Sequence, residues 1–215
     1  MKIFADREEA GSMLALKLRK YTQDPCMILA IPRGGVPVAA SVAQEAGLPL
    51  YLMLARKIGH PDNPEYAIGA ATLDDYFLVK EAGIPSEYIG EELLRVRKRL
   101  LEMKRLFAVE WAPELMHGKT VILIDDGIAT GNTLLATIRM IRKYFPRRII
   151  IAVPVASARS VYDLSAMADD IIVLEVPEFF NAVGSVYEHF GQVTDDEVMG
   201  YIKSLAPAVK VPISH

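Results

Sequence analysis

The sequence contains a single cysteine, Cys26, among its 215 residues. A lone thiol excludes a disulfide framework and any metal site built from several cysteines. Uninterrupted apolar runs, such as Ile149–Val155, have the length of a strand and fall short of the about 18 residues expected of a membrane-spanning helix. The first residues become charged at Asp6, so they lack the apolar core of a signal peptide. These absences predict a cytoplasmic protein with no membrane partner.

Basic residues are too few for a broadly basic nucleic-acid-binding surface. The chain has 24 Lys and Arg against 27 Asp and Glu, which gives a formal net charge of −3. The one dense basic run, Arg95–Arg99, follows Glu91 at helical spacing, which is typical of a solvated helix face. The 52% of hydrophobic residues can build a sizeable core, which excludes intrinsic disorder.

Short apolar runs alternate with amphipathic stretches between a helix start at Asp6 and a capping box at Thr194–Glu197. Buried strands are predicted at 26–31, 50–55, 120–124, 148–153 and 170–174, and helices at 36–46, 132–144 and 158–166. Residues 66–72 and 76–80 are predicted to pair as a hairpin. This order predicts one α/β domain over residues 1–215, with a mainly parallel sheet flanked by helices. Ligands bind at the carboxyl ends of the strands in such sheets.

A helical insertion is predicted at residues 86–111. Its apolar stripe advances by three or four residues through Ile89, Leu93, Val96, Leu100, Met103 and Phe107. The stripe is shorter than three heptads, so it predicts packing against the body of the protein or a second subunit.

The most informative segment follows the predicted strand at 120–124 and runs from Asp125-Asp126 through Gly127 to Thr133. A turn of small residues that leads into a helix directs backbone N–H groups into one concavity, and Thr130 adds a hydroxyl donor. Such a turn suits a phosphate, whereas two carboxylates suit ribose hydroxyls or a hydrated Mg²⁺. The segment therefore predicts a sugar-phosphate site; the alternative is an ordinary strand–turn–helix with two solvated aspartates.

Cations follow two other predicted strands. Adjacent glycines in Pro32-Arg33-Gly34-Gly35 permit unusual backbone angles and a close approach by an oxygen-rich ligand, and the Arg33 fork suits phosphate. A tight turn with an exposed arginine is the alternative. Arg56-Lys57 opens the segment 56–66, which two prolines and a glycine mark as an exposed loop.

These motifs resemble those of the type I phosphoribosyltransferases, which combine a hydrophobic strand, two acidic residues and a Thr-Gly loop that binds phosphoribosyl pyrophosphate (PRPP). The resemblance covers roughly residues 25 to 200 and is sharp only in these loops. It implies that Asp125 and Asp126 contact the ribose hydroxyls and hold Mg²⁺ through water. It further implies a 5′-phosphate site at Ala129, Thr130, Gly131, Asn132 and Thr133, and a pyrophosphate site at Arg33, Gly34, Gly35 and Lys57.

Arg56-Lys57 resembles the start of the mobile catalytic loop of orotate phosphoribosyltransferases, and Glu65-Tyr66 resembles the glutamate-tyrosine pair of the adenine enzymes. The resemblance implies that Arg56, Lys57 and His60 neutralise the departing pyrophosphate across a dimer interface, and that Glu65 donates or accepts a proton. A solvated loop is the alternative for Lys57, His60 and Glu65. Ala129 stands where the 6-oxopurine enzymes carry an aspartate, which disfavours hypoxanthine and guanine as substrates.

Residues 175–192 resemble the variable hood of the family. Phe179 and Phe180 are candidates to stack on a planar base, although closing the core is the alternative for both. Tyr187 and Phe190 are predicted to be structural.

The resemblance implies a homodimeric transferase that moves a phosphoribosyl group from Mg-PRPP to a nitrogenous acceptor and releases pyrophosphate. A PRPP-sensing regulatory protein with the same fold and no catalysis is an alternative. A sugar-phosphate hydrolase or transferase that does not use PRPP is a third. The sequence does not specify the acceptor.

Overall fold

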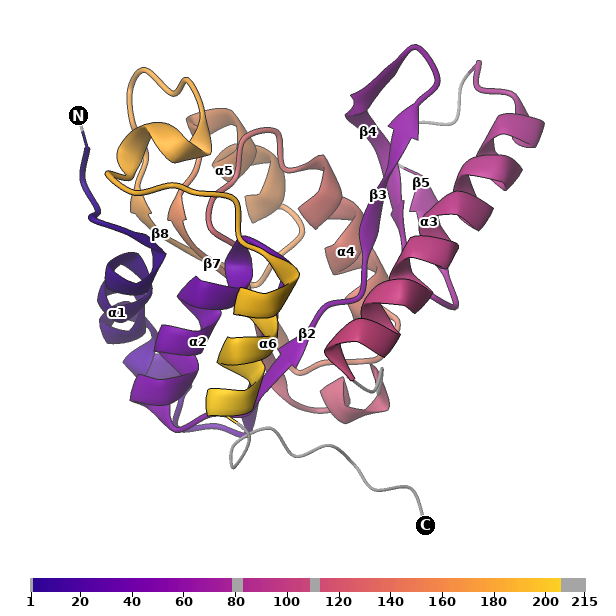
Figure 1. Cartoon of the computed structure of the whole chain (residues 1–215). Helices are drawn as coiled ribbons and strands as arrows, with labels where there is room; N and C mark the ends of the chain where they lie inside the picture. The colour runs from indigo at the N-terminus through magenta and orange to yellow at the C-terminus, as the bar shows by residue number, and fades with distance from the viewer. Residues whose placement is uncertain (1, 79–82, 109–112, 206–215) are drawn as a thin grey trace.

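A five-stranded parallel sheet forms the centre of the computed structural model, which describes residues 2–78, 83–108 and 113–205 (Figure 1). The strand order is β2-β1-β6-β7-β8, and every neighbouring pair is parallel. The strands are β1 (Cys26–Ala30), β2 (Leu50–Leu52), β6 (Thr120–Ile124), β7 (Arg148–Val155) and β8 (Asp170–Glu175). The mainly parallel α/β sheet expected from the sequence is confirmed, with β2 shorter than predicted.

Helices cover both faces of this sheet. One face carries α1 (Arg7–Leu18), α2 (Gly35–Ala46) and α6 (Asp195–Ser204), and the other carries α4 (Asn132–Arg142) and α5 (Ala158–Ser165) (Figure 1). Alternate residues along each strand pack against opposite faces of the sheet. Ile28 and Ile122 belong to one buried cluster, and Leu29 and Leu123 belong to the other. Burial on both faces explains why β1 and β6 are apolar throughout.

The predicted helix starts are confirmed. The Asp6 side chain accepts a hydrogen bond from the backbone N–H of Glu9 at 2.9 Å, and Thr194 and Glu197 form the expected capping box. Among the described residues, no helix combines the length and the apolar character needed to cross a membrane.

A second, antiparallel sheet lies beside the first, in the order β3-β4-β5, with β3 (Arg56–His60), β4 (Asn63–Ala71) and β5 (Tyr76–Leu78). The predicted β4–β5 hairpin is confirmed, apart from residues 79 and 80, which lie outside the described residues. The prediction of an exposed loop over 56–66 is wrong, because β3 pairs with β4 along this segment. Arg56 lies opposite Ala71, and His60 lies opposite Asn63. The two prolines lie at the tip of this hairpin, where the register shifts, and they do not prevent pairing below it.

The predicted insertion is α3 (Ser86–Phe107), which lies beside β3 (Figure 1). Val96, Leu100, Met103 and Phe107 are buried, and the Tyr88 hydroxyl donates to the Gly59 carbonyl of β3 at 2.9 Å. Packing against the body of the protein is therefore confirmed. Residues 109–111 of the predicted insertion lie outside the described residues.

Candidate functional site

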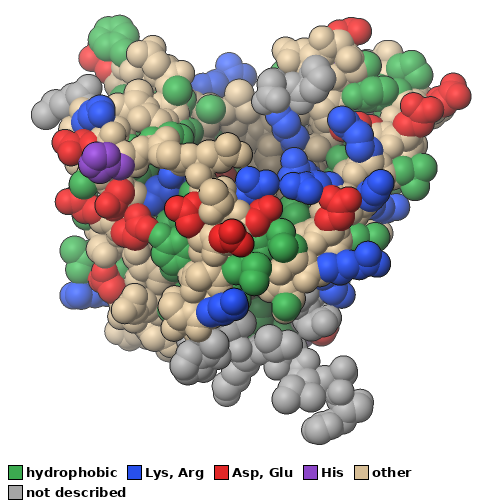
Figure 2. Space-filling model, in the orientation of Figure 1, with side chains coloured by type: hydrophobic (Ala, Val, Ile, Leu, Met, Phe, Trp, Pro, Cys, Tyr) green, Lys and Arg blue, Asp and Glu red, His purple; other side chains and the backbone are tan. Residues whose placement is uncertain are grey.

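A cavity of about 590 Å³ opens at the carboxyl ends of β1 and β6. Figure 2 shows the molecule hollowed between the sheet β3-β4-β5 and the rest of the protein, with Lys and Arg side chains gathered along the hollow. The cavity is lined by Arg7, Pro32, Arg33, Gly34, Arg56, Met103, Asp126, Phe190, Gly191, Gln192 and Val193. It thus brings together residues of three segments singled out in the sequence, at 32–35, 56–66 and 125–133.

The two adjacent acids leave β6 as partly buried side chains. The backbone N–H of Asp126 donates to Asp125 Oδ1 at 2.8 Å, which holds the Asp125 carboxyl group against the backbone of Asp126. Burial, and then the charge of Asp126, raises the pKa of Asp125 well above its usual range. Burial also raises the pKa of Asp126, although Arg7 acts in the opposite direction. The pair is therefore a site where a bound cation would be stabilised.

Arg7, a residue that the sequence analysis missed, holds Asp126 in place. Its Nε donates to Asp126 Oδ2 at 2.9 Å, and its Nη2 lies 2.9 Å from the same oxygen. Its Nη1 donates to the Gly191 carbonyl at 2.9 Å, and its guanidinium carbon lies 3.9 Å from the centre of the Phe190 ring. On the other side, the Tyr187 hydroxyl donates to the Asp126 carbonyl at 2.7 Å. No local pattern signals a partner 119 residues away.

We expect Arg7→Ala to lower the free energy of unfolding by roughly 3 kcal/mol, because it leaves the Asp126 carboxylate without its ion-pair partner in a mostly buried setting. Lys17→Ala is the matched control: it removes one positive charge from the exposed face of the same helix. Urea unfolding of both variants measures the difference. Equal stability of the two variants would show that the Arg7–Asp126 pair contributes nothing to folding.

Gly34 and Gly35 abut the acid pair. A Cβ on Gly34 would overlap Asp126 Oδ2 and lie 2.6 Å from Asp126 Cγ, and a Cβ on Gly35 would lie 2.7 Å from the Ile124 carbonyl oxygen and 2.8 Å from Asp125 Cα. Gly34 has ordinary right-handed backbone angles, φ −56° and ψ −37°. The expectation that unusual backbone angles require glycine is therefore wrong at this position, where the close approach of Asp126 requires it.

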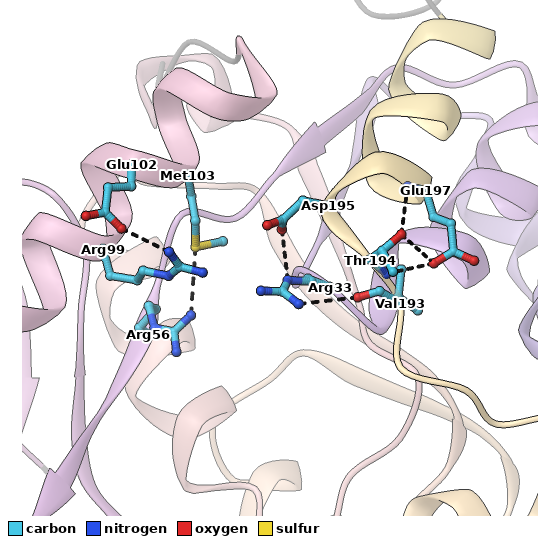
Figure 3. Close-up of polar contacts among 9 residues, drawn as sticks. All are labelled: Arg33, Arg56, Arg99, Glu102, Met103, Val193, Thr194, Asp195 and Glu197. Carbon is cyan, nitrogen blue, oxygen red and sulfur yellow. Dashed lines mark hydrogen bonds and ion pairs between the residues drawn. The ribbon is translucent and has the colours of Figure 1, made fainter.

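Arg33 reaches across the cavity from the loop after β1. Its Nε lies 2.9 Å from Asp195 Oδ1 at the start of α6, and its Nη1 donates to the Val193 carbonyl at 3.5 Å. Figure 3 shows its guanidinium group pointing toward those of Arg56 and Arg99 on the opposite side. Asp195 and the Val193 carbonyl thus fix the orientation of the predicted phosphate-binding arginine, and about a third of its side chain is exposed.

Hydrogen bonds from the start of α5 hold the backbone of the predicted 5′-phosphate loop. The Ala129 carbonyl accepts hydrogen bonds from the Ser157 and Ser160 hydroxyls, at 2.9 and 2.7 Å. Gly131 has φ 73° and precedes α4 without a side-chain cap. The first amides of α4 lack acceptors within the helix, as at every helix start, which suits an anion.

The members of this loop differ in orientation. Ala129 and Thr130 are exposed, and Thr133 is half-buried. The Asn132 side chain donates to the Ala67 carbonyl of β4 at 3.2 Å, so it joins α4 to the second sheet.

The remaining predicted residues are spread along the β3–β4 hairpin. Arg56 lines the cavity, and Lys57 lines an adjoining cavity between β3 and α3. His60 Nδ1 accepts a hydrogen bond from the Asp62 N–H at 3.1 Å, close to the hairpin tip. Glu65 follows Asn63 in β4, six residues or about 20 Å along the strand from Ala71, which pairs with Arg56. The side chain of Glu65 lies outside the described residues, and its role stays a prediction.

Hydrogen bonds connect the predicted hood at 175–192 to the amino-terminal segment. Phe4 bridges to Tyr187, and the backbone N–H of Glu188 donates to the Phe4 carbonyl at 2.8 Å. Tyr187 is 1% exposed, as expected of a structural residue.

Neither of the two predicted stacking residues lines the 590 Å³ cavity. Phe179 is 83% exposed, and Phe180 packs against the small buried cluster that contains Tyr187. The aromatic side chain at the cavity is Phe190, which stacks on Tyr187 with 5.0 Å between the ring centres. Phe190, which is predicted to be structural, therefore also lies at the cavity.

Comparison with known proteins shows which families and structures this chain is similar to. A family model described as phosphoribosyl transferase domain matches residues 5–188. A Mycobacterium tuberculosis (strain H37Rv) protein named "putative phosphoribosyl transferase" is 33% identical over 207 residues, which cover 94% of this chain and 47% of that protein. The chain thus spans about half the length of this curated relative. An amidophosphoribosyltransferase of Mycobacterium bovis is 26% identical over 141 residues, 66% of this chain and 21% of that protein.

One solved structure is similar to this chain over nearly the full length of both proteins. The crystal structure of TT1426 from Thermus thermophilus has a TM-score of 0.81 and 38% sequence identity, and the match covers 95% of this chain and 99% of that chain. The shared fold therefore includes the second sheet and the elements around the cavity.

Proposed function

Because the chain belongs to the phosphoribosyl transferase domain family, we propose that it transfers the phosphoribosyl group of Mg-PRPP to a nitrogenous acceptor and releases pyrophosphate. One observation carries the proposal: Gly34 and Gly35 abut the acid pair Asp125 and Asp126 beside a cavity that Arg33 also lines. A pentose with phosphoryl groups at two positions fits this arrangement. The acids suit the hydroxyls of the pentose, and the cations suit its pyrophosphate. The start of α4 suits its 5′-phosphate.

In the proposed reaction, a bond forms between the acceptor nitrogen and the anomeric carbon while the bond from that carbon to the pyrophosphate oxygen breaks, with inversion. Arg33 and Arg56 hold the leaving pyrophosphate, and Lys57 contributes from the adjoining cavity. Asp125 and Asp126 orient the ribose hydroxyls. These contributions are positioning and electrostatic stabilisation of charge that develops in the transition state. The acceptor enters beside Phe190, which offers a ring face at the cavity.

The donor set fits a Mg²⁺ ion that arrives with its substrate. No three His, Cys, Asp or Glu side chains converge on a metal-sized site within the part of the chain that the structure describes. Mg²⁺ commonly binds through one or two carboxylates together with substrate phosphates. Burial, and then the charge of Asp126, raises the pKa of Asp125, and a cation shared by the two carboxylates would offset both effects. When bound, the ion supplies charge neutralisation of the pyrophosphate.

Pyrophosphate release from Mg-PRPP, measured with a panel of nucleobases and small amines, tests the proposal. We expect one acceptor class to accelerate release, and Arg33→Ala to slow it by about 100-fold because a phosphate-binding charge is lost. Arg148→Ala is the matched control, since Arg148 is exposed at the opposite end of the sheet.

Two outcomes would contradict the transferase. Titration showing that Mg-PRPP binds, without release for any acceptor, would favour the PRPP-sensing regulator. Absence of both binding and release would exclude both functions. We further propose a homodimer, which light scattering on the purified protein tests.

A further inference from the structure

A second cavity, of about 380 Å³, lies between β3 and α3, and we propose that it binds a small molecule carrying two or more phosphoryl groups. Its lining comes from Arg56, Lys57, Gly59, Glu92, Arg95, Val96 and Arg99. It adjoins the first cavity, because Arg56 lines both. The proposal adds Arg95 and Arg99 of α3 to Arg56 and Lys57, which the proposed transfer reaction already uses, and it does not rest on that reaction.

The charge of this lining is unbalanced. Four cationic side chains and one carboxylate line the cavity, in a chain whose formal net charge is −3. The carboxylate, Glu92, has a side chain only 8% exposed and accepts two hydrogen bonds from Arg95, at 2.8 and 2.7 Å. Arg99 pairs with Glu102 of its own helix at 2.9 Å. Glu92 and Glu102 are therefore already engaged by arginines of α3.

Neither of these two acids pairs with Arg56. Across the described residues it forms no ion pair, and its Nη1 contacts Met103 Sδ at 3.8 Å. Burial, and then the charges of Arg99, Arg33 and Arg95, lowers the pKa of Arg56. Figure 3 shows Arg56 and Arg99 side by side, facing Arg33. Like charges held this close repel one another, and an anion among them removes that repulsion.

The geometry selects a phosphoryl ligand of small size. Planar guanidinium groups donate to phosphate in pairs, and here they come from two facing elements, so several phosphoryl oxygens can be bound at once. The volume of about 380 Å³ lies within the range of small-molecule pockets. The predicted solvated face at Arg95–Arg99 is correct only in part: Arg95 and Arg99 line the cavity, whereas Lys98, between them in sequence, does not.

Calorimetric titration of the whole protein with tripolyphosphate tests the site. We expect two binding events, one in each cavity. Arg33→Ala removes the event in the first cavity, and Arg95→Ala with Arg99→Ala weakens the event in the second at least tenfold. The matched control is Lys98→Ala with Arg105→Ala, which removes two charges from exposed positions of the same helix and keeps both events. Arg95→Gln with Arg99→Gln, which keeps the helix and the side-chain stems, should reproduce the loss.

Three results with tripolyphosphate would overturn the proposal: a single binding event in the wild-type protein, both events intact in the Arg95/Arg99 variant, or equal weakening in the Lys98/Arg105 control. A fourth would be a loss of affinity in the Arg95/Arg99 variant that is seen with single-stranded RNA and not with tripolyphosphate. That result would assign these cations to nucleic acid. A nucleoside triphosphate titrated in parallel identifies the source of the phosphoryl groups: equal affinity favours a free polyphosphate, and tighter binding favours a nucleotide. If PRPP fails to bind while the second event persists, the transferase function fails and this site stands.

Discussion

Asp125→Asn is expected to slow pyrophosphate release by about 100-fold or more and, at the same time, to raise the thermal stability of the protein. The substitution removes the charge that the proposed reaction places beside the ribose hydroxyls. It keeps an oxygen that can accept the Asp126 N–H, which lies 2.8 Å from Asp125 Oδ1. The loop can therefore retain its shape while the chemistry is lost.

The gain in stability follows from the pKa of Asp125. Burial and the charge of Asp126 raise this pKa well above its usual range in the folded chain, so ionisation costs more there than in the unfolded chain. The free energy of unfolding of the wild-type protein therefore falls as the pH rises from about 3.9, the ordinary aspartate pKa, through the raised folded pKa. Asparagine does not ionise, and the variant avoids that loss at neutral pH.

Melting temperatures between pH 3 and pH 8 measure this effect. The variant should melt at least about 2 °C higher than the wild-type protein at pH 7, and the difference should vanish below about pH 4. Asp74→Asn makes the same chemical change at an exposed position and should alter neither melting nor pyrophosphate release. A lower melting temperature for Asp125→Asn at pH 7, or undiminished release, would contradict the prediction.

The parallel sheet could be predicted because its strands are buried on both faces. In β1 and β6, successive residues face opposite layers of helices, so apolar side chains are required at every position. The helix caps at Asp6 and Thr194 were equally predictable, since each cap is formed by residues three apart in sequence. Local chemistry of this kind needs no knowledge of the rest of the fold.

The strand β3 could not be predicted from its own residues. Arg56–His60 contains two cations, a glycine and a histidine, and only Ile58 and Gly59 are buried. Its partner β4 and the covering helix α3 make it a strand, and neither is encoded within those five residues.

The acid pair was identified from the sequence, but its surroundings were not. Arg7 reaches Asp126 from α1, and the two glycines approach the pair from the loop after β1. These contacts join segments that are distant in the sequence, and none produces a local pattern. The sequence therefore predicted the segments 32–35 and 125–133 of the candidate site, and the structure shows how these two segments are held together.

Gly35→Ala is expected to lower the free energy of unfolding by about 3 kcal/mol and to abolish PRPP binding, because it forces the two loops of the site apart. The added Cβ would lie 2.7 Å from the Ile124 carbonyl oxygen and 2.8 Å from Asp125 Cα. Both are backbone atoms, so no side-chain rotation relieves the overlap. The carboxyl end of β6 must move away from α2, and Asp125 moves with it.

Gly34→Ala and Gly90→Ala complete the comparison. At Gly34 the overlap is with the Asp126 carboxylate, which can move only by breaking its pair with Arg7, so we expect a loss of stability at this position too. At Gly90, exposed within α3, a Cβ meets nothing within 4 Å, and alanine should stabilise the helix by about 0.5–1 kcal/mol. Urea unfolding and Mg-PRPP titration of the three variants check this order. Because all three make the same chemical change, a Gly35→Ala protein with wild-type stability and affinity would show that the contact between the glycine loop and the acid pair does not hold the site together.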